Sequence, residues 1–235
     1  MKVLAIVPAR GGSKGLPGKN VRLLLDKPLI AWSIQQGLAC KYVDEVIVST
    51  DSEEIATIAQ QYGGVVPFLR PASLAKDATP TADVLLHLID EMEKQGKVYD
   101  YILLLEPTSP LREVSDLDDA FEKLINTPVA SSIVGVSKVE SQHPEFCVTI
   151  SDLGFLQSRN NFKVLRRQEI DELFFYEGSL YLSKVESFKA KRNFYHDGTL
   201  AYEMPKWKSF EIDDITDFII VESILKNLDK IKGQL

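Results

Sequence analysis

The sequence predicts an α/β fold built around a mainly parallel, doubly wound sheet. Short continuous apolar runs recur along the first half of the chain, as is typical of strands buried on both faces. Segments with helical apolar periodicity fill the intervals between them. Polar clusters follow several of the runs directly, at the carboxyl ends of the expected strands, where open α/β sheets bind ligands. The chain has 235 residues, of which 45% are hydrophobic, enough for one well-buried domain.

Five segments are the expected strands. Pro8 ends the first of them, because proline lacks the N–H that a sheet ladder needs. The last is expected near the end of the chain, directly before a final helix. The five segments are Val3–Val7, Glu45–Ser49, Tyr101–Leu105, Ser131–Val136 and Trp207–Ile212.

Helices are expected between and after these strands. Apolar residues three or four positions apart mark their buried faces: Ile30, Ile34 and Leu38; Leu85, Leu88, Ile89 and Met92; Leu117, Phe121 and Leu124; and Ile215, Phe218, Ile219, Leu225 and Leu228 in the final helix. Capping patterns predict where helices begin: Asp51 with Glu54, Thr79 before Pro80, Ser115 with Asp118, and Asp214 with Asp217.

The alternation of strands and helices is lost in residues 139–205, approximately. This segment contains short β-type runs and many charged residues. We interpret it as a β-rich excursion inserted before the last strand and helix, and expect it to serve as a dimerisation arm. The whole of 1–235 is expected to form a single domain.

Composition excludes several classes of protein. The net charge of −7 argues against general nucleic-acid binding, which needs a basic face. No apolar stretch is long enough for a membrane span, and no signal peptide is recognised at the start. Cys40 and Cys147 stand apart without a metal-binding motif and are expected to be reduced thiols. These features predict a cytoplasmic enzyme.

The loop after the first strand is the strongest candidate for a phosphate site. Its glycines allow backbone N–H groups to approach an anion, and Arg10, Ser13, Lys14 and Lys19 add polar and cationic contacts suited to a triphosphate. A Walker A loop would need glycine at position 13 and Ser or Thr at position 20, and the glycines do not give a dinucleotide fingerprint. A solvated surface turn is the alternative, disfavoured by the position after a buried strand.

A pair of acids lies near the end of the chain. Glu211 and Asp213 are two positions apart in the last expected strand, so both side chains should share one face. Two such carboxylates repel each other unless a cation lies between them, and Mg²⁺ prefers oxygen ligands. The alternative is two solvated acids at the end of an edge strand.

Residues 6–20 resemble the N-terminal signature of the CMP-sialic acid synthetase family, which includes CMP-legionaminate and CMP-pseudaminate synthetases. Further blocks in the same order resemble that family at residues 48–56, 69–77, 107–112, 166–168, 178–181 and 212–214. The resemblance therefore covers nearly the whole chain.

This resemblance implies a Rossmann-like nucleotidyltransferase fold, a homodimer, and the transfer of CMP from CTP to an acidic nine-carbon sugar with Mg²⁺. By position it implies a catalytic role for Arg10, Lys14 and Lys19, and a metal-binding role for Glu211 and Asp213. It assigns nucleotide contacts to Ala9, Arg10, Gly11, Ser13, Asn20 and Arg70. It assigns sugar contacts to Thr81, Glu106, Thr108, Arg166, Gln168 and Tyr181.

Three positions depart from the family pattern. Glu106 stands where the family often has Gln, Glu177 where it often has Asn, and Glu211 where it often has Asp. The first two change the charge near an anionic sugar, so they bear on which sugar is used. Glu106 can contact sugar hydroxyls or only brace its loop; both interpretations stay open.

Three alternative functions are weighed. One is a nucleotidyltransferase for another sugar acid, such as the eight-carbon Kdo. Another is a glycosyltransferase, but its usual Asp-x-Asp motif could only be residues 116–118, which lie in an expected helix start. The third is a nucleotide-binding module without catalysis, against which Lys14, Lys19 and Asp213 argue.

Overall fold

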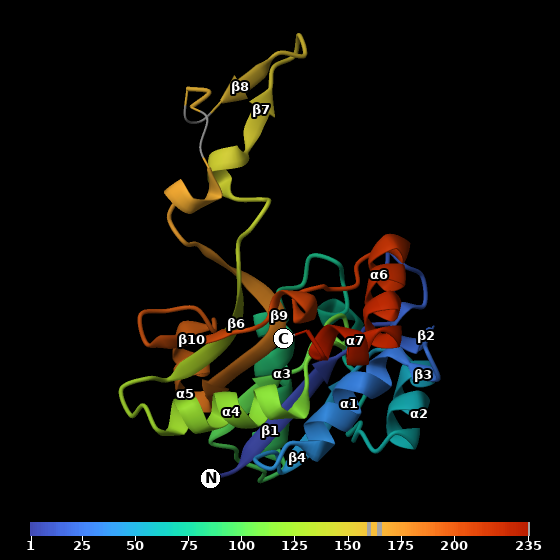
Figure 1. The fold of residues 1–235 in the computed structure, drawn as a ribbon. Helices are drawn as coiled ribbons and strands as arrows, with labels where there is room; N and C mark the ends of the chain where they lie inside the picture. Colours follow the sequence, from blue (N-terminus) through green and yellow to red (C-terminus); the bar gives the residue numbers. More distant parts are fainter. Residues whose placement is uncertain (159–160, 164–165, 235) are drawn as a thin grey trace.

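A computed structural model describes residues 1–158, 161–163 and 166–234 of the chain. Its centre is a six-stranded sheet in the order β10–β6–β9–β5–β1–β4 (Figure 1). The elements are β1 (Val3–Pro8), β2 (Leu23–Leu24), β3 (Lys27–Pro28), α1 (Leu29–Ala39), β4 (Glu45–Ser49), α2 (Glu53–Gln61), α3 (Thr81–Lys94), β5 (Tyr101–Leu104), α4 (Val114–Ile125), β6 (Ser132–Lys138), β7 (Val148–Ile150), β8 (Leu156–Ser158), β9 (Phe174–Lys184), α5 (Val185–Lys191), β10 (Thr199–Glu203), α6 (Ile215–Lys226) and α7 (Leu228–Lys232).

The sheet is mostly parallel, as the sequence predicts. Strand β1 pairs in parallel with β4 and β5, and β10 pairs in parallel with β6. Strand β9 is the exception, since it runs antiparallel between β5 and β6. The carboxyl ends of the parallel strands therefore lie along one edge, which is where open α/β sheets place their ligands.

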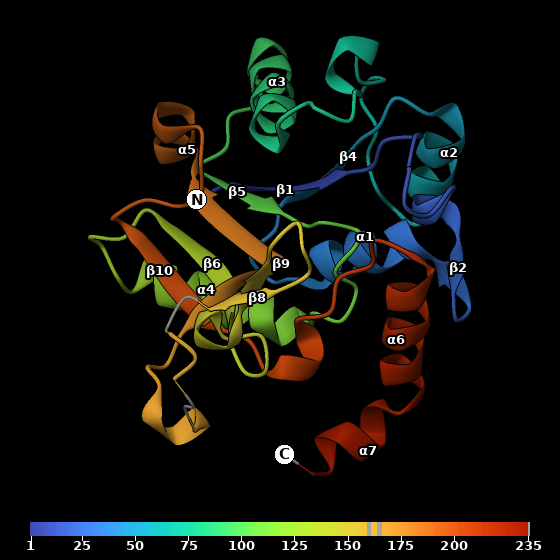
Figure 2. The ribbon, with the colours of Figure 1, turned by 90° about the horizontal axis from the view of Figure 1, so that it is seen from above.

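Helices cover both faces of the sheet. Alternate residues of β1 enter two different cores: Val3, Ala5 and Val7 pack in one, and Leu4 and Ile6 in the other. Helices α1, α2 and α4 close the first core, and α3 and α5 close the second (Figure 2). The doubly wound arrangement is confirmed.

Four predicted strands agree with the structure to within two residues, but three predicted helix starts are wrong. Helix α2 is capped by Ser52, whose hydroxyl accepts a hydrogen bond from the Ile55 N–H, and not by Asp51. Helix α3 begins at Thr81 without a cap from Thr79, and α4 begins after Glu113, not Ser115. A short polar residue lies within two positions of each true cap, so the pattern alone does not fix where the helix begins.

The predicted strand Trp207–Ile212 is wrong. A 3₁₀ helix, Lys206–Lys208, lies there instead, and residues 209–212 form no ladder. The last strand of the sheet is β10, further upstream. Two predicted faces also differ, because Leu38 of α1 is exposed, and Ile215 and Ile219 of α6 face outward. The prediction that Asp214 and Asp217 begin a helix is confirmed by a capping box at α6, but the expected single final helix is divided, since Leu228 begins α7.

A third core attaches the end of the chain to the first loop. Leu16 packs with Ile212, Phe218 and Val221, and the Arg22 guanidinium lies over the Phe218 ring. Burial of these side chains holds α6 beside the loop that follows β1. The sequence neighbours of Ile212 are thereby placed next to the glycine-rich loop.

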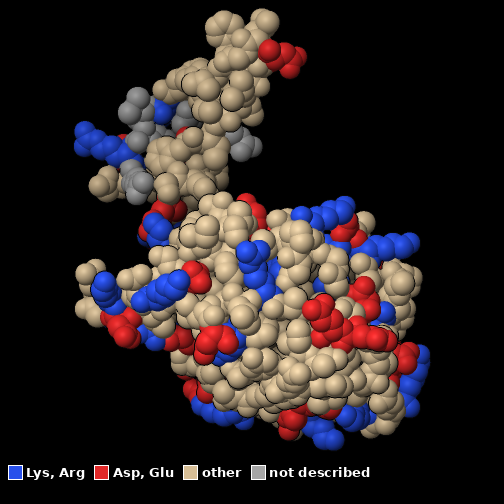
Figure 3. Space-filling view, turned by 90° about the vertical axis from the view of Figure 1, so that its right-hand side faces the viewer, with Lys and Arg blue, Asp and Glu red and all other residues tan. Residues whose placement is uncertain are grey.

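An arm projects from the body between β6 and β9 (Figure 1). It carries the β7–β8 hairpin and two short 3₁₀ helices, and it is shorter than the predicted excursion, because β9, α5 and β10 all belong to the body. Its far half bears few charged residues compared with the body (Figure 3). Apolar side chains exposed there include Val148, Ile150, Leu153, Phe155 and Leu156.

Across the described part of the chain, every helix is too short or too polar to cross a bilayer.

Candidate functional site

The glycine-rich loop leaves β1 at the ligand-binding edge of the sheet and is tied to its neighbours by backbone contacts. The Ala9 N–H donates to the Ser49 carbonyl (2.9 Å), and the Gly11 N–H donates to Asp51 Oδ1 (2.9 Å). Asn20, almost fully buried, returns to the start of the loop through a bond from Nδ2 to the Arg10 carbonyl (3.1 Å). These bonds fix the start of the loop at the end of β1.

Two of the predicted phosphate-binding cations converge on one carboxylate. Arg10 and Lys14 both form ion pairs with Asp77, and these bonds hold the pKa of Asp77 below its ordinary value. Asp77 is the last residue of the 69–77 block, and the family resemblance assigned it no role. An anion thus already bridges the two cations, at the place where the first loop would receive a phosphate.

Lys19 brings the first loop to the end of the chain. Its ammonium donates to the Ile212 carbonyl (2.8 Å) and lies 3.4 Å from Asp213 Oδ1. The Lys19 side chain is only 14% exposed, whereas that of Asp213 is 83% exposed. Gly15 also packs on the Asp213 carbonyl so closely that a Cβ would collide with it. The predicted phosphate and metal residues therefore share one region.

Arg70 lies beneath the same region. It is buried, donates from Nε to Ser49 Oγ (3.0 Å), and bonds the Ser49 carbonyl from its terminal nitrogen. Burial lowers the pKa of Arg70, while the charges of Asp51 and Glu106 oppose that shift. The remaining predicted nucleotide residue, Ser13, is half-buried in the loop.

A hollow of about 250 Å³ opens at the carboxyl end of β5. Three predicted sugar contacts line it together: Thr81 from α3, Glu106 after β5, and Tyr181 from β9. Sequence analysis missed its other polar lining, Arg192, Asn193 and Tyr195, which follow α5. No motif marks those residues; they reach the hollow because α5 and β9 pack in the same core. Their apolar companions in the wall are Ala82, Leu104, Phe188 and Phe194.

Glu106, which lines this hollow, is one of three glutamates with raised pKa values; the charges of Glu177 and Glu106 both act on the third, Glu211. Burial raises the pKa of Glu106 to about 7, against the opposing charges of Arg112, Lys19 and Arg70. Burial also raises the pKa of Glu211 to about 7, helped by the charges of Glu177, Asp213 and Glu106. The pKa of Glu177 is raised by burial as well, although its Oε1 accepts a bond from Ser179 Oγ (2.6 Å). All three are departures from the family pattern.

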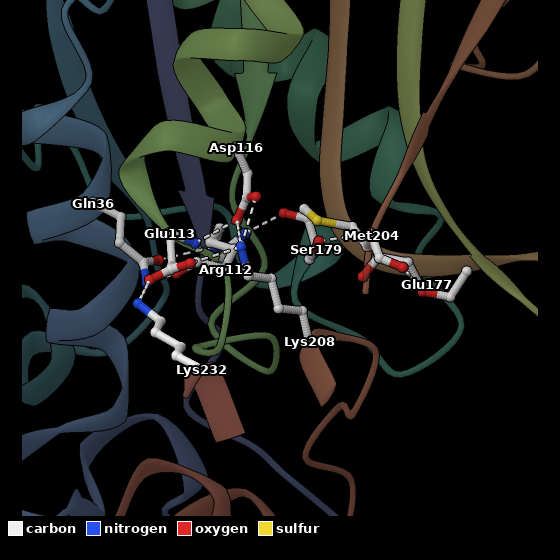
Figure 4. Close-up of polar contacts among 10 residues, drawn as sticks. Gln36, Arg112, Glu113, Asp116, Glu177, Ser179, Met204, Lys208 and Lys232 are labelled. Atoms are coloured by element: carbon white, nitrogen blue, oxygen red, sulfur yellow. Dashed lines mark hydrogen bonds and ion pairs between the residues drawn. The ribbon is translucent and has the colours of Figure 1, made fainter. Parts of the chain in front are cut away.

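Arg112 anchors the loop that carries Glu106. Its guanidinium is almost fully buried and bonds the carbonyls of Ser179 (2.6 Å) and Glu106, Ser33 Oγ (2.7 Å) and Gln36 Oε1 (2.9 Å). Burial lowers its pKa to about 10. Figure 4 shows Arg112 between Gln36 on one side and Ser179 on the other. It thereby connects α1, β9 and the end of β5.

A second buried cation fixes the segment that precedes Glu211. Lys208 forms ion pairs with Asp116 (2.7 Å) and Glu113 (2.8 Å), and Glu113 also pairs with Lys232 of α7 (Figure 4). The start of α4 therefore binds both the 3₁₀ helix around Lys208 and the last helix. This network explains why the predicted strand is absent: Lys208 turns inward to a carboxylate instead of continuing a ladder.

Not all of the predicted sugar-binding residues lie together within a single copy of the chain. The N–H of Ile212 donates to the Thr108 carbonyl (2.9 Å), so Thr108 lies beside the terminal segment. Arg166 and Gln168, in contrast, are exposed on the arm, between its hairpin and β9. The described contacts of this chain do not bring either of them to the hollow.

Glu211 and Asp213 could provide some, but not all, of the oxygen ligands that a hard cation such as Mg²⁺ needs. Glu211 and Asp213 are not in a strand, so the predicted reason for a shared face is wrong, although their charges still act on each other. Within the described residues, no three His, Cys, Asp or Glu side chains gather as a metal cage. A cation held by these two acids would therefore need further oxygen ligands, which phosphates provide.

The fold and these groups define a nucleotidyltransferase: a cationic glycine loop at the carboxyl edge of a parallel sheet, beside a sugar-sized hollow. The model of the cytidylyltransferase family matches residues 4–233, and the chain belongs to this family. It is a CTP-dependent nucleotidyltransferase, and the resemblance drawn from the sequence blocks is confirmed.

Curated relatives support the assignment to this family. The chain is 35% identical over 228 residues to the CMP-N,N'-diacetyllegionaminic acid synthase of Legionella pneumophila, covering 96% of this chain and 97% of that protein. It is 29% identical to the pseudaminic acid cytidylyltransferase of Campylobacter jejuni, covering 96% and 97%. It is 34% identical to the N-acylneuraminate cytidylyltransferase of Streptococcus agalactiae, but spans only 52% of that longer protein.

Solved structures show the same fold. A CMP:2-keto-3-deoxy-manno-octonic acid synthetase complexed with CTP superimposes with a TM-score of 0.68 at 19% identity, covering 97% of this chain and 99% of that one. At this identity the likeness concerns the fold alone. It agrees with a Rossmann-like nucleotidyltransferase.

Proposed function

We propose that the protein transfers CMP from CTP to the anomeric hydroxyl of a nine-carbon 2-keto sugar acid of the sialic acid type and releases pyrophosphate. The observation that carries this proposal is the junction of Lys19 with Asp213, next to the hollow lined by Glu106 and Tyr181. The relatives named for legionaminic, pseudaminic and neuraminic acids support the substrate class.

The first loop supplies the electrostatic part of the reaction. The sugar hydroxyl attacks the α-phosphorus of CTP, and negative charge grows on the departing pyrophosphate. Arg10, Lys14 and Lys19 stabilise that charge, because cations fixed in advance need little rearrangement during the reaction. The phosphates replace Asp77 as the partner of Arg10 and Lys14.

We also propose that Mg²⁺ takes part, held by Glu211 and Asp213 with phosphate oxygens completing its ligands. When bound, the ion neutralises triphosphate charge. Burial and the charges of Glu177, Asp213 and Glu106 raise the pKa of Glu211, and a cation held there would offset their repulsion, which supports the assignment.

The arm supports a proposed homodimer. Its β7–β8 hairpin projects away from the body (Figure 1), and a second copy would bury the apolar side chains that are exposed there. The arm also carries Arg166 and Gln168, so pairing gives these residues a route to the partner's hollow. A cytoplasmic location is part of the same proposal; it is supported by two free cysteines, Cys40 and Cys147.

A product assay tests the proposal. The protein is incubated with CTP, Mg²⁺ and, separately, sialic, legionaminic, pseudaminic and Kdo acids, and pyrophosphate release is measured together with the CMP-sugar. We expect turnover with a nine-carbon acid. Turnover with Kdo alone would move the protein to the eight-carbon class, and CTP binding without any product would indicate a module that only binds nucleotides.

A further inference from the structure

The Glu106 side chain faces the hollow without a partner. Across the described residues, contacts to Glu106 as an acceptor go to its backbone carbonyl, which bonds Ser33 (3.1 Å) and Arg112; none goes to its carboxylate. The charges of Arg112, Lys19 and Arg70 act on this carboxylate, but the described hydrogen bonds of these three residues go to other acceptors.

An unpaired carboxylate of this kind has a cost in folding stability. A carboxylate that is partly removed from water without a hydrogen bond or ion pair lowers the stability of the folded state or takes up a proton. Burial raises the pKa of Glu106 and outweighs the opposing charges of the nearby cations. An unpaired acid that opens into a ligand-sized hollow is characteristic of a binding site.

The walls of the hollow are aromatic on the side of β9 and α5. The Tyr181 ring lies 5.4 Å from that of Phe194 and 6.1 Å from that of Tyr195, and Phe188 lies 4.7 Å from Phe194. Aromatic faces attract cations. The guanidinium that lines the hollow, Arg192, is neutralised by an ion pair with Asp83 of α3.

We propose that this hollow selects a sugar acid whose substituent carries a positively charged nitrogen, an amine or an amidine, and that Glu106 accepts its N–H groups. The aromatic rings enclose the apolar part of the same substituent. The proposal rests on the proposed function for the sugar class and adds the charge of one substituent.

Matched substrates test the inference. They are nine-carbon 2-keto sugar acids that differ at one nitrogen-bearing carbon, where an acetamido group is replaced by an acetamidino or a free amino group, at each such carbon in turn. We expect kcat/KM to favour the cationic sugar by roughly tenfold or more at one position, as for a charge-assisted hydrogen bond.

Variants of Glu106 then test whether this residue causes the preference for a cationic sugar. Glu106→Gln keeps the shape of the side chain and removes its charge, so the preference should fall by roughly tenfold or more, while Glu106→Asp should retain part of it. Glu186→Gln, on the exposed face of α5, is the control and should keep the wild-type ratio. Unchanged CTP binding in each variant shows that the fold is intact.

Measuring sugar binding as well as turnover distinguishes a failure of this inference from a failure of the proposed function. A preference for acetamido sugars at every position, or a cationic preference that Glu106→Gln leaves unchanged, overturns the inference. Absence of pyrophosphate with every sugar would contradict the proposed function instead. The ratio of dissociation constants for the matched sugars, titrated with CTP present, still decides the charge preference in that case.

Discussion

Lys19 and Asp213 are 194 positions apart, yet the Lys19 ammonium lies 3.4 Å from the Asp213 carboxylate. The same nitrogen donates to the Ile212 carbonyl at 2.8 Å. The loop after the first strand and the segment before the last helix therefore form one site, and several consequences can be measured.

Lys19→Ala removes the least exposed of the three loop cations. We expect turnover to fall by about 10² to 10³, the usual effect of losing one contact to a developing charge. The fold should survive, because the core around Leu16 and Phe218 is untouched. Steady-state kinetics and thermal unfolding check both points, with Lys94→Ala on the exposed face of α3 as control. Near-wild-type turnover would contradict the phosphate assignment.

Gly15→Ala probes the contact between the loop and Asp213. A Cβ at this position collides with the Asp213 backbone carbonyl, whereas a Cβ at Gly12 meets nothing within 4 Å. We expect Gly15→Ala to lower turnover by roughly tenfold or more, since small displacements of catalytic groups are costly. Gly12→Ala should stay close to wild type. Equal effects of the two substitutions would show that the close approach at Gly15 has no role.

Asp77→Asn releases Arg10 and Lys14 from their shared ion pairs. We expect CTP to bind about two- to fivefold more tightly, because exposed ion pairs of this kind are weak and compete only modestly with the phosphates. Raising the salt concentration should reduce the difference. Titration calorimetry with CTP at two ionic strengths measures it. Weaker binding would mean that Asp77 instead orders the cations for the phosphates.

Glu106→Gln should change how stability depends on pH. The Glu106 pKa is raised from 4.5 to about 7, so the folded state holds this proton more tightly than the unfolded chain. Stability is therefore lost as pH rises from 4.5 through 7. We expect the variant's gain in unfolding free energy to be about 1–2 kcal/mol larger at pH 8 than at pH 5. Denaturant titrations at both pH values test this; equal gains would contradict the raised pKa.

Leu153→Ser with Phe155→Ser targets the proposed dimer. Both side chains are exposed at the far end of the arm, 85% and 71% respectively, so the isolated chain loses no packing. We expect the variant to be monomeric by light scattering while its melting temperature reflects only lost association. Val129→Ser, equally exposed on the body, should leave the mass unchanged. A monomeric wild-type protein would disprove the dimer.

Much of the sheet could be predicted from the sequence, because strands such as β1 and β4 are continuous apolar runs buried on both faces. The segment around Lys208 could not, since its apolar spacing imitates a strand while its lysine is bound to Asp116, 92 positions away. Asp77 was missed for the same reason: its partners lie in a distant loop. The spacing of apolar residues indicates which side of a helix or strand is buried. It does not indicate which charged residue from a distant part of the chain will contact that element.

Strand β9 begins at the base of the arm, where Phe174 pairs with Lys138, and continues through Glu177 to Tyr181. It is hydrogen-bonded to β6 and, further along, to β5. The strand that starts at the base of the arm therefore also supplies Tyr181 to the wall of the hollow, so the arm and this part of the hollow are joined by one continuous, doubly hydrogen-bonded element.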